Sequence, residues 1–242
     1  MAVKQEKRQQ REKEILDCAR TLIGQHGFFD LKMSDLARAA GISVGTLYVH
    51  FASKEDLLLG LAMWAGAGRT AYLQTARQHD GPALEKFIVA SLLDILFSIE
   101  NPDLFEMEYL AMSPSIWQRA THGRHQDFLR KVSDATRMFQ EFLDQAAPVL
   151  GENYSRDRGR TLNLGSWALS FGMNALALSE ITDAHYGRLL RENALPTFCD
   201  GLTAMLVGAG WQADTAHSVI YGLGQHYMPQ HFARVPLADA GG

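Results

Sequence analysis

Apolar residues recur at intervals of three and four positions along almost the whole chain, which is the spacing of one face of an α-helix. In the first such segment, about residues 6–26, this stripe consists of Ile15, Leu16, Ala19, Leu22 and Ile23, and Gly27 ends it. No segment shows the regular alternation of apolar and polar residues that is typical of a half-buried strand. The pattern therefore predicts an all-α protein.

Turn-forming residues divide the rest of the chain into further helices. We expect helices over residues 33–40, 44–50, 54–79, 82–98, 102–112, 122–147, 156–180, 184–208 and 213–226, with a short helical piece after Pro114. Proline removes a backbone donor, so Pro196 should kink the helix over 184–208. The tail from Met228 onward is rich in turn formers and is expected to be mobile.

Residues 33–56 predict two short helices joined by a tight turn. The apolar positions of this segment are Met33, Leu36, Ala37, Ala40, Ile42, Leu47 and Phe51. They form one inward face that is interrupted at Gly41, which can adopt the left-handed conformation that ends a helix. Ser43 stands where its hydroxyl can cap the free N–H groups of a second helix. A helix, a glycine turn and a helix make the unit that places its second helix in the major groove of DNA.

The second helix carries side chains suited to nucleic acid. With Leu47 and Phe51 inward, its exposed side holds Val44, Gly45, Thr46, Tyr48 and His50. The three polar side chains can hydrogen-bond phosphate oxygens or base edges, and glycine lets the backbone approach a surface closely. A helical corner with no ligand would instead favour Glu, Lys and Ala on this face. Ser53 and Asp56 then have the spacing of a capping box, which leaves Lys54 free to reach a phosphate.

The order MSDLARAAGIS-VGTLYVHFASKEDLL resembles the N-terminal domain of the TetR family of ligand-responsive transcriptional regulators, over about residues 10–60. The resemblance implies a three-helix helix-turn-helix domain at residues 1–53, joined by a long fourth helix to a helical effector-binding and dimerisation domain at residues 54–242. The recognition helix would be the one at 44–50. The expected DNA-binding residues are Ser34, Ser43, Val44, Gly45, Thr46, Tyr48, His50 and Lys54.

Three positions depart from the family's pattern. Lys32 stands where the family usually has a hydroxyl residue that caps the helix at 33–40. The side chain of Ser34 is too short to reach the bases and is expected to reach only a phosphate. Val44, where relatives often carry Lys, Arg or Gln, can offer only a contact to a thymine methyl group. The operator sequence is therefore not inherited from a relative.

The two long helices at 156–180 and 184–208 match those that pair as a four-helix bundle across the two-fold axis of TetR-family dimers. We expect the dimer interface to include Phe171, Ala175, Leu202, Met205 and Leu206. Alternatively, these apolar stripes complete the core of a single chain. Dimerisation is favoured because one short recognition helix reads few base pairs, whereas two copies about 34–36 Å apart read a palindrome.

The C-terminal region is rich in aromatic and methionine residues, the inventory of an apolar ligand pocket. The candidate pocket residues are Trp64, Phe105, Tyr109, Met112, Trp117, Phe128, Phe139, Trp167 and Asn174. At any single one of these positions, plain core is the more common role. Asn174 interrupts an apolar face and could instead make an interhelical hydrogen bond that fixes the register of a dimer.

Charge separates the two ends of the chain. Residues 1–50 hold eight Lys and Arg against six Asp and Glu, whereas the remainder holds fifteen against twenty-one. The first thirteen residues carry five basic side chains, which would suit the DNA backbone or simply solvate a frayed terminus. No apolar segment follows this start, and the apolar run near 164–178 is too short to span a bilayer. We expect a cytoplasmic protein without membrane contact, and buried, reduced thiols at Cys18 and Cys199.

Enzymatic signatures do not occur. The chain has no Glu-x-x-His pair, glycine-rich phosphate loop or G-x-S-x-G elbow, so we expect no catalytic residues and no cofactor. His122 and His125 lie one helical turn apart near Asp127, but such histidines are more often solvated at a helix start, and we expect no metal.

The sequence thus predicts a homodimeric repressor that binds a palindromic double-stranded DNA operator. A small hydrophobic or aromatic effector between the helices at 54–79 and 156–180 would release it. An activator, or a regulator controlled by a protein partner, fits the same residues, and a helical-bundle enzyme is the remote alternative.

Overall fold

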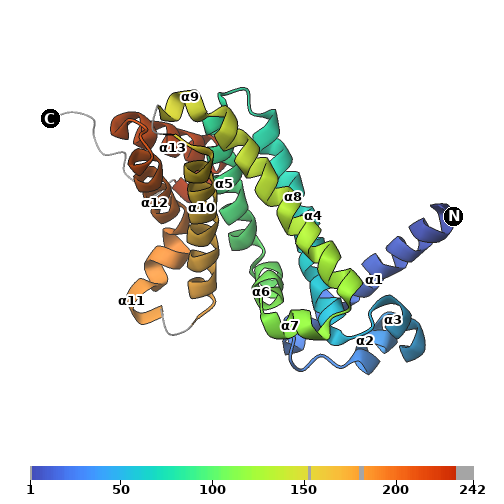
Figure 1. Cartoon of the computed structure of the whole chain (residues 1–242). Coiled ribbons are helices and arrows are strands. Elements are labelled where there is room, and N and C mark those ends of the chain that lie inside the picture. Colours follow the sequence, from blue (N-terminus) through green and yellow to red (C-terminus); the bar gives the residue numbers. More distant parts are fainter. Residues whose placement is uncertain (1, 152–153, 180–182, 233–242) are drawn as a thin grey trace. The chain divides into compact units, whose positions relative to one another are not determined.

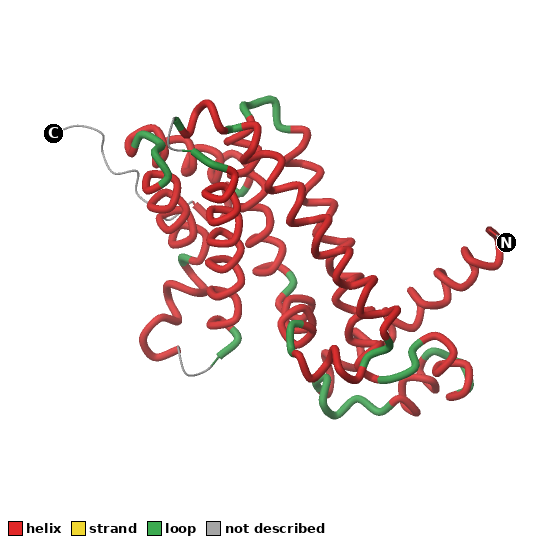
Figure 2. The backbone as a smooth tube through the Cα atoms, in the orientation of Figure 1, coloured by secondary structure: helices red, strands yellow, loops and turns green. Residues whose placement is uncertain are grey.

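The computed structural model describes residues 2–151, 154–179 and 183–232. Over these ranges the regular elements are all helices, without a strand, which confirms the all-α prediction (Figure 2). Figure 1 shows the helices in chain order. None of the helices in the described part of the chain is both long and apolar enough to cross a membrane.

The chain folds into two compact units. The N-terminal unit comprises the residues up to Gly68 together with Asp103–Val132, and the C-terminal unit comprises Arg69–Pro102 and the residues from Ser133 onward. These units are defined by packing and differ from the predicted functional division after residue 53, which stays a prediction. Two of the three boundaries fall inside the long helices α4 (Lys54–Gln78) and α8 (His122–Gln145), and the third follows Pro102, the first residue of α6 (Pro102–Ala111).

The N-terminal unit is built around the apolar stripe of its first helix. Its helices are α1 (Ala2–His26), α2 (Met33–Ala39), α3 (Val44–His50), the first part of α4, α6 (Pro102–Ala111), α7 (Pro114–Arg119) and the first part of α8. Ile15 and Ala19 are fully buried, as the stripe predicted, and they pack in one cluster with Leu36, Leu47 and Phe51. The buried faces of α2 and α3 therefore hold the two short helices against α1.

The C-terminal unit surrounds α5 (Ala83–Glu100), a helix that is apolar on nearly every side and therefore buried. Its other helices are the remainders of α4 and α8, α9 (Ala147–Leu150), α10 (Arg156–Ala177), α11 (Asp183–Gly187), α12 (Ala194–Gly208), α13 (Ala213–Tyr227) and α14 (Pro229–Phe232). α5 packs against α10, α12 and α13. Phe87 and Phe198 are among the largest fully buried side chains in this core.

The prediction of one continuous helix over residues 184–208 is wrong. The structure has α11, a π-helical turn at Arg188–Glu192, a break at Asn193, and then α12 from Ala194. Pro196 therefore lies in the first turn of α12, where a missing N–H costs no intrahelical hydrogen bond, and it kinks nothing.

The ends of other helices also differ from the prediction. The helix expected over 122–147 ends at Gln145 and is followed by the short α9, and the helix expected over 156–180 ends at Ala177. The start of the tail is packed rather than mobile, because Met228 and Phe232 are buried in the core of the C-terminal unit. The remainder of the tail lies outside the described residues.

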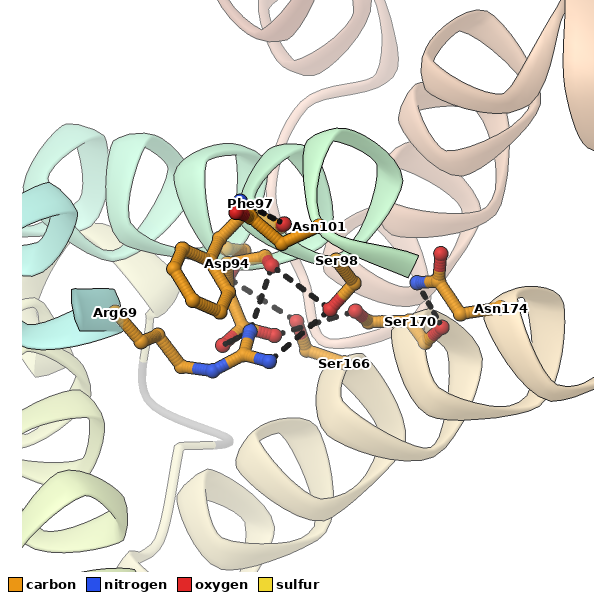
Figure 3. Close-up of polar contacts among 9 residues, drawn as sticks. Arg69, Asp94, Phe97, Ser98, Asn101, Ser166, Ser170 and Asn174 are labelled. Atoms are coloured by element: carbon orange, nitrogen blue, oxygen red, sulfur yellow. Dashed lines mark hydrogen bonds and ion pairs between the residues drawn. The ribbon is translucent and has the colours of Figure 1, made fainter. Parts of the chain in front are cut away.

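A line of polar side chains crosses this otherwise apolar core. Asp94 and Ser98 of α5 lie opposite Ser166, Ser170 and Asn174 of α10 (Figure 3), and Ser91 of α5 contacts Ser166. Ser166 Oγ is 3.1 Å from Ser91 Oγ, and Ser170 Oγ donates to Asp94 Oδ2 at 3.2 Å. The two helices are therefore joined by hydrogen bonds as well as by apolar packing.

Arg69 of α4 supplies the positive charge of this polar line. Its Nη1 donates to the carbonyl oxygen and to Oδ1 of Asp94, both at 2.8 Å, and its Nη2 donates to Ser98 Oγ at 3.1 Å. The Arg69 and Asp94 side chains are only 13% and 16% exposed. A largely buried ion pair thus fixes α4 to α5 within the C-terminal unit (Figure 3).

Candidate DNA-binding site

The turn between α2 and α3 has the conformation that its sequence predicts. Gly41 has a φ of +65°, in the left-handed region that suits glycine. The Ile42 N–H donates to the Ala37 carbonyl at 3.0 Å and the Gly41 N–H donates to the Arg38 carbonyl at 3.2 Å. This paired arrangement is a Schellman motif, which satisfies the last carbonyls of α2 and stops the helix.

Ser43 caps the second helix, as its position predicts. Its Oγ accepts a hydrogen bond from the Thr46 N–H at 3.0 Å and lies 2.8 Å from the Thr46 hydroxyl. The Ser43 hydroxyl is therefore engaged in hydrogen bonds within the protein, where it stabilises the start of α3. Lys32, in contrast, stands at the cap of α2 and makes no side-chain cap hydrogen bond, as the departure from the family's pattern predicts.

The two faces of α3 are divided as expected. Leu47 is fully buried, whereas Val44 and Tyr48 are 43% and 47% exposed, and Gly45 and Thr46 are exposed as well. Val49 is 72% exposed, the most exposed large apolar side chain of this helix, and it was not singled out in the sequence. The only feature of the sequence that could have indicated the exposure of Val49 is its position two residues after Leu47, on the opposite side of the helix. Ser34, in the first turn of α2, is also exposed.

The prediction that His50 projects outward is wrong. Its side chain is 11% exposed, and its Nδ1 lies 3.5 Å from Glu12 Oε1 of α1. This Nδ1 is buried and makes no hydrogen bond to any described residue. His50 is the last residue of α3, and at that position the helix surface turns toward α1 instead of solvent.

Lys54 ties its helix to the turn before α2. Its ammonium donates to the Phe29 carbonyl at 2.8 Å and lies 4.7 Å from the centroid of the Phe28 ring. Burial lowers the pKa of the Lys54 ammonium from its ordinary value, against the opposing effect of Asp30 and Glu55. An ammonium has three donors, so a phosphate contact by Lys54 stays a prediction.

The capping box at the start of α4 is present and has a second role. The Asp56 N–H donates to Ser53 Oγ at 3.0 Å, and the Asp56 carboxylate accepts from the Ala52 N–H at 3.2 Å. The same carboxylate accepts from the N–H of Thr121 at 2.7 Å and from its hydroxyl at 3.1 Å. Sequence spacing identified Asp56, but nothing local could identify Thr121.

A cavity of about 760 Å³ lies beside α3 in the N-terminal unit. It is lined by α1, by the C-terminal part of α3 and by the start of α8, including Arg8, Tyr48 and Arg124. The basic start of the chain and the exposed tyrosine of α3 therefore border the same hollow.

The predicted effector-pocket residues are not brought together within one unit. Trp64, Phe105, Tyr109, Met112, Trp117 and Phe128 belong to the N-terminal unit, whereas Phe139, Trp167 and Asn174 belong to the C-terminal unit. Phe105 and Phe128 are buried, but Tyr109 and Trp167 are 47% and 40% exposed. Asn174 donates from Nδ2 to the Ser170 carbonyl at 2.9 Å within α10.

The predicted dimer residues divide into two groups. Leu202 and Leu206 are fully buried in the core of their own chain, so the prediction that they form an interface is wrong. Phe171, Ala175 and Met205 are half-buried. The exposed apolar residues of α10 and the residue that caps its end are instead Leu164, Trp167, Leu176 and Leu178.

The remaining reactive side chains are held by structural contacts. Cys199 is buried, and burial raises the pKa of its thiol to about 12. Cys18 is half-buried and less enclosed than predicted. The His125 ring stacks on Trp117, with ring centroids 5.3 Å apart. Across the described ranges, no group of three His, Cys, Asp or Glu is placed to hold a metal ion.

Known proteins resemble this chain most clearly at its N-terminal domain. Residues 15–61 match the family model of bacterial regulatory proteins, tetR family. The chain is 45% identical over 49 residues to the HTH-type transcriptional regulator BetI of Agrobacterium fabrum, covering 20% of this chain and 24% of that protein. It is 46% identical over 48 residues to the HTH-type transcriptional repressor KstR2 of Rhodococcus jostii, with coverage of 20% and 24%. The chain therefore matches only about a quarter of the length of these curated relatives.

Solved structures extend the likeness to the C-terminal helices. The transcriptional regulator FadR from Bacillus subtilis, in complex with stearoyl-CoA, superimposes with a TM-score of 0.59 at 16% identity, covering 81% of this chain and 98% of that chain. The ketosteroid transcriptional regulator KstR2 of Mycobacterium tuberculosis gives a TM-score of 0.53 at 18% identity, with coverage of 82% and 94%. Identities this low establish the fold alone.

The fold and the site together define an all-helical protein with an N-terminal helix-turn-helix domain. Residues 15–61 therefore resemble the bacterial regulatory proteins of the tetR family, the family that the motif at residues 33–56 indicated. The curated relatives that match this domain are named as transcriptional regulators.

Proposed function

We propose that the protein is a ligand-responsive transcriptional repressor that binds a palindromic operator as a homodimer. The observation that carries the proposal is the exposed face of α3, where Val44, Thr46 and Tyr48 are presented by a helix whose two ends are both capped. Exposing a tyrosine on a seven-residue helix gains little for folding, whereas its hydroxyl suits a phosphate or a base edge.

Substitution of Tyr48 tests the DNA contact. We expect Tyr48→Phe to weaken binding to duplex DNA about tenfold, because it removes one hydrogen bond to a charged group. The salt dependence should not change, since no counterion release is lost. The matched control is Tyr186→Phe, a 56% exposed tyrosine of the C-terminal unit. Equal affinities of wild type and Tyr48→Phe in a fluorescence anisotropy titration would remove Tyr48 from the site.

The same titration tests Lys54. If its ammonium reaches a phosphate, Lys54→Met reduces the slope of log affinity against log salt by about one. An unchanged slope would assign Lys54 entirely to the hydrogen bond with the Phe29 carbonyl.

For the dimer, we propose that two copies pair through the exposed apolar face of α10. Leu164 and Trp167 are 60% and 40% exposed, and Trp167 stacks edge-on against Phe171 with centroids 6.1 Å apart. Leu164, Phe171 and Leu178, the last at the C-terminal cap of α10, follow one another at intervals of seven residues and so lie along the same side of the helix. Such a stripe left open to water is costly, and a second copy covers it.

Leu164→Glu tests this surface without disturbing the core, because Leu164 is largely exposed. We expect monomers in light scattering together with weaker DNA binding. Leu129→Glu is the control, since Leu129 is 39% exposed on α8. A dimer that persists in Leu164→Glu would place the interface elsewhere.

For the effector, we propose a small molecule with a large apolar part. Two relatives of the same fold were solved with stearoyl-CoA and with isovaleryl coenzyme A, the latter together with operator DNA. Acyl-CoA thioesters of different chain length are therefore the first compounds to test. An effector weakens DNA binding only by the free energy with which it prefers the form that binds DNA poorly. This coupling free energy is typically about 1–3 kcal/mol. Release of a bound duplex on titration supports the proposal, and saturable binding without release would contradict it.

A further inference from the structure

The C-terminal end of the recognition helix is held by a residue from a distant part of the sequence. α3 ends at His50, whose carbonyl oxygen accepts a hydrogen bond from Arg124 Nη2 at 3.1 Å, across a separation of 74 residues. The last carbonyls of a helix have no partner within that helix, and the helix dipole favours a cation beside them. Arg124 therefore supplies what α3 lacks at this end.

Arg124 is itself held in place. Its guanidinium carbon lies 4.9 Å from the centroid of the Phe51 ring, and its Nη2 is 3.5 Å from Glu12 Oε2 of α1. The side chain is only 16% exposed. A planar guanidinium that stacks on a ring and meets two acceptors has little freedom to move. Through this one side chain, α8 is connected to α1 and to the end of α3.

A second contact anchors the start of α8 at the same place. Thr121, directly before α8, donates twice to the buried carboxylate of Asp56. These bonds fix the position from which Arg124 reaches His50. α8 belongs to the N-terminal unit up to Val132 and to the C-terminal unit from Ser133. A helix that both units share thus contacts the end of the recognition helix near its own first residues, through Arg124.

We infer that Arg124 is a positioning residue for DNA recognition. It sets the direction of α3 through the His50 carbonyl and does not itself bind DNA. The inference rests on the proposed DNA binding. The competing role for Arg124 is a direct phosphate contact, because Arg124 lines the same cavity as Tyr48. The two roles differ in how they affect sequence discrimination and salt dependence.

The test uses two labelled duplexes of equal length. One is selected from a random-sequence library with the wild-type protein, and the other is an unselected duplex. Affinities for wild type and Arg124→Met are measured by fluorescence anisotropy between about 50 and 200 mM salt, a range in which phosphate contacts have a large effect. Methionine keeps the aliphatic stem and removes the charge and the donors.

A positioning role predicts a specific pattern of losses. Arg124→Met should bind the selected duplex about tenfold more weakly and the unselected duplex within about twofold of wild type, because only base contacts depend on the direction of α3. The salt slope should stay the same. A slope reduced by about one would show a phosphate contact and overturn the inference. Equal binding of the selected duplex by both proteins would overturn it as well.

Additional variants separate positioning from general destabilisation. Arg130→Met is the matched control, because Arg130 lies on the same helix, pairs with Asp127 and is 69% exposed, and its discrimination should equal that of wild type. Arg124→Lys keeps a cation near the helix end and should recover part of the discrimination. If circular dichroism shows that Arg124→Met is unfolded, the affinities of Arg124→Gln for the two duplexes and its salt slope are measured instead and judged by the same criteria.

The failure of the two ideas is distinguishable. Wild-type protein that binds neither duplex at low salt would contradict the proposed DNA binding. Wild-type binding together with undiminished discrimination by Arg124→Met would contradict only the positioning role.

Discussion

The ion pair between Arg69 and Asp94 allows a quantitative test of how the C-terminal unit is held together. Replacing only Arg69 with Met leaves the Asp94 carboxylate largely buried, with the Ser170 hydroxyl still donating to it. Breaking a buried pair from one side costs about 3–5 kcal/mol, and the partial exposure of both side chains favours the lower end of that range. We therefore expect Arg69→Met to lose about 3 kcal/mol of unfolding free energy.

Replacing both partners should cost much less. The double variant Arg69→Met with Asp94→Leu leaves no buried charge, and methionine can still pack against Phe97, over whose ring the Arg69 guanidinium now lies at 4.6 Å. The hydrogen bonds from Arg69 to the Asp94 carbonyl and to Ser98 Oγ are lost in Arg69→Met and in the double variant alike. The double variant also loses the hydrogen bond of the Ser170 hydroxyl, about 1 kcal/mol. The double variant should thus be more stable than either single variant.

Urea denaturation followed by circular dichroism measures these differences. One fixed protein concentration is used, because the proposed dimerisation would add to the apparent stability. A loss of about 3 kcal/mol corresponds to a melting temperature lowered by roughly 6–12 °C for a chain of this size. The reasoning fails if the double variant is destabilised by the sum of the two single losses. It also fails if Arg69→Met loses less than about 1 kcal/mol, since the pair would then behave as a surface salt bridge.

Two further predictions concern the recognition helix and the core. Gly45→Ala should raise the unfolding free energy by about 0.5–1 kcal/mol, because alanine is the better helix former and its Cβ would meet only Ser43 Oγ at 3.8 Å. If the backbone of α3 approaches DNA at this residue, affinity in the anisotropy assay falls although stability rises; a rise in both would show that Gly45 does not lie against DNA. The pKa of the Cys199 thiol is raised from 9.0 to about 12, so the unfolded chain loses this proton first as the pH rises. Stability should therefore fall above pH 9 by up to about 1.4 kcal/mol per pH unit from this group. Cys199→Ala should reduce that slope in urea titrations, and identical slopes would show that other groups, such as Tyr154, account for the loss.

Much of the candidate DNA-binding site follows from local sequence. The end of α2 depends on a glycine that adopts positive φ, and the start of α3 depends on a serine one turn before the N–H that it caps. The inward positions Leu47 and Phe51 follow from the helical repeat. These features involve residues a few positions apart, so the chain need not be folded for them to be recognised.

The packing of α3 could not be predicted in the same way. His50 was expected at the surface because the helical repeat places it beside Thr46 and Tyr48. It is enclosed because Glu12 and Arg124, both distant in sequence, lie against the end of α3. Helical periodicity says which side of a helix is apolar, but it carries no information on what covers a polar side.

The dimer residues show the same limit at the other end of the chain. Periodicity identified apolar stripes on α10 and α12, and it could not decide which stripe faces the chain's own core. Tertiary packing buries Leu202 and Leu206 and leaves Leu164 and Trp167 exposed. The sequence alone thus determined the helices, the turn and the cap, because these depend on short-range hydrogen bonds and backbone conformation. Only the tertiary structure decided which apolar and polar faces stay exposed. Whether a side chain is buried depends on the residues that pack against it, and many of these are distant in sequence.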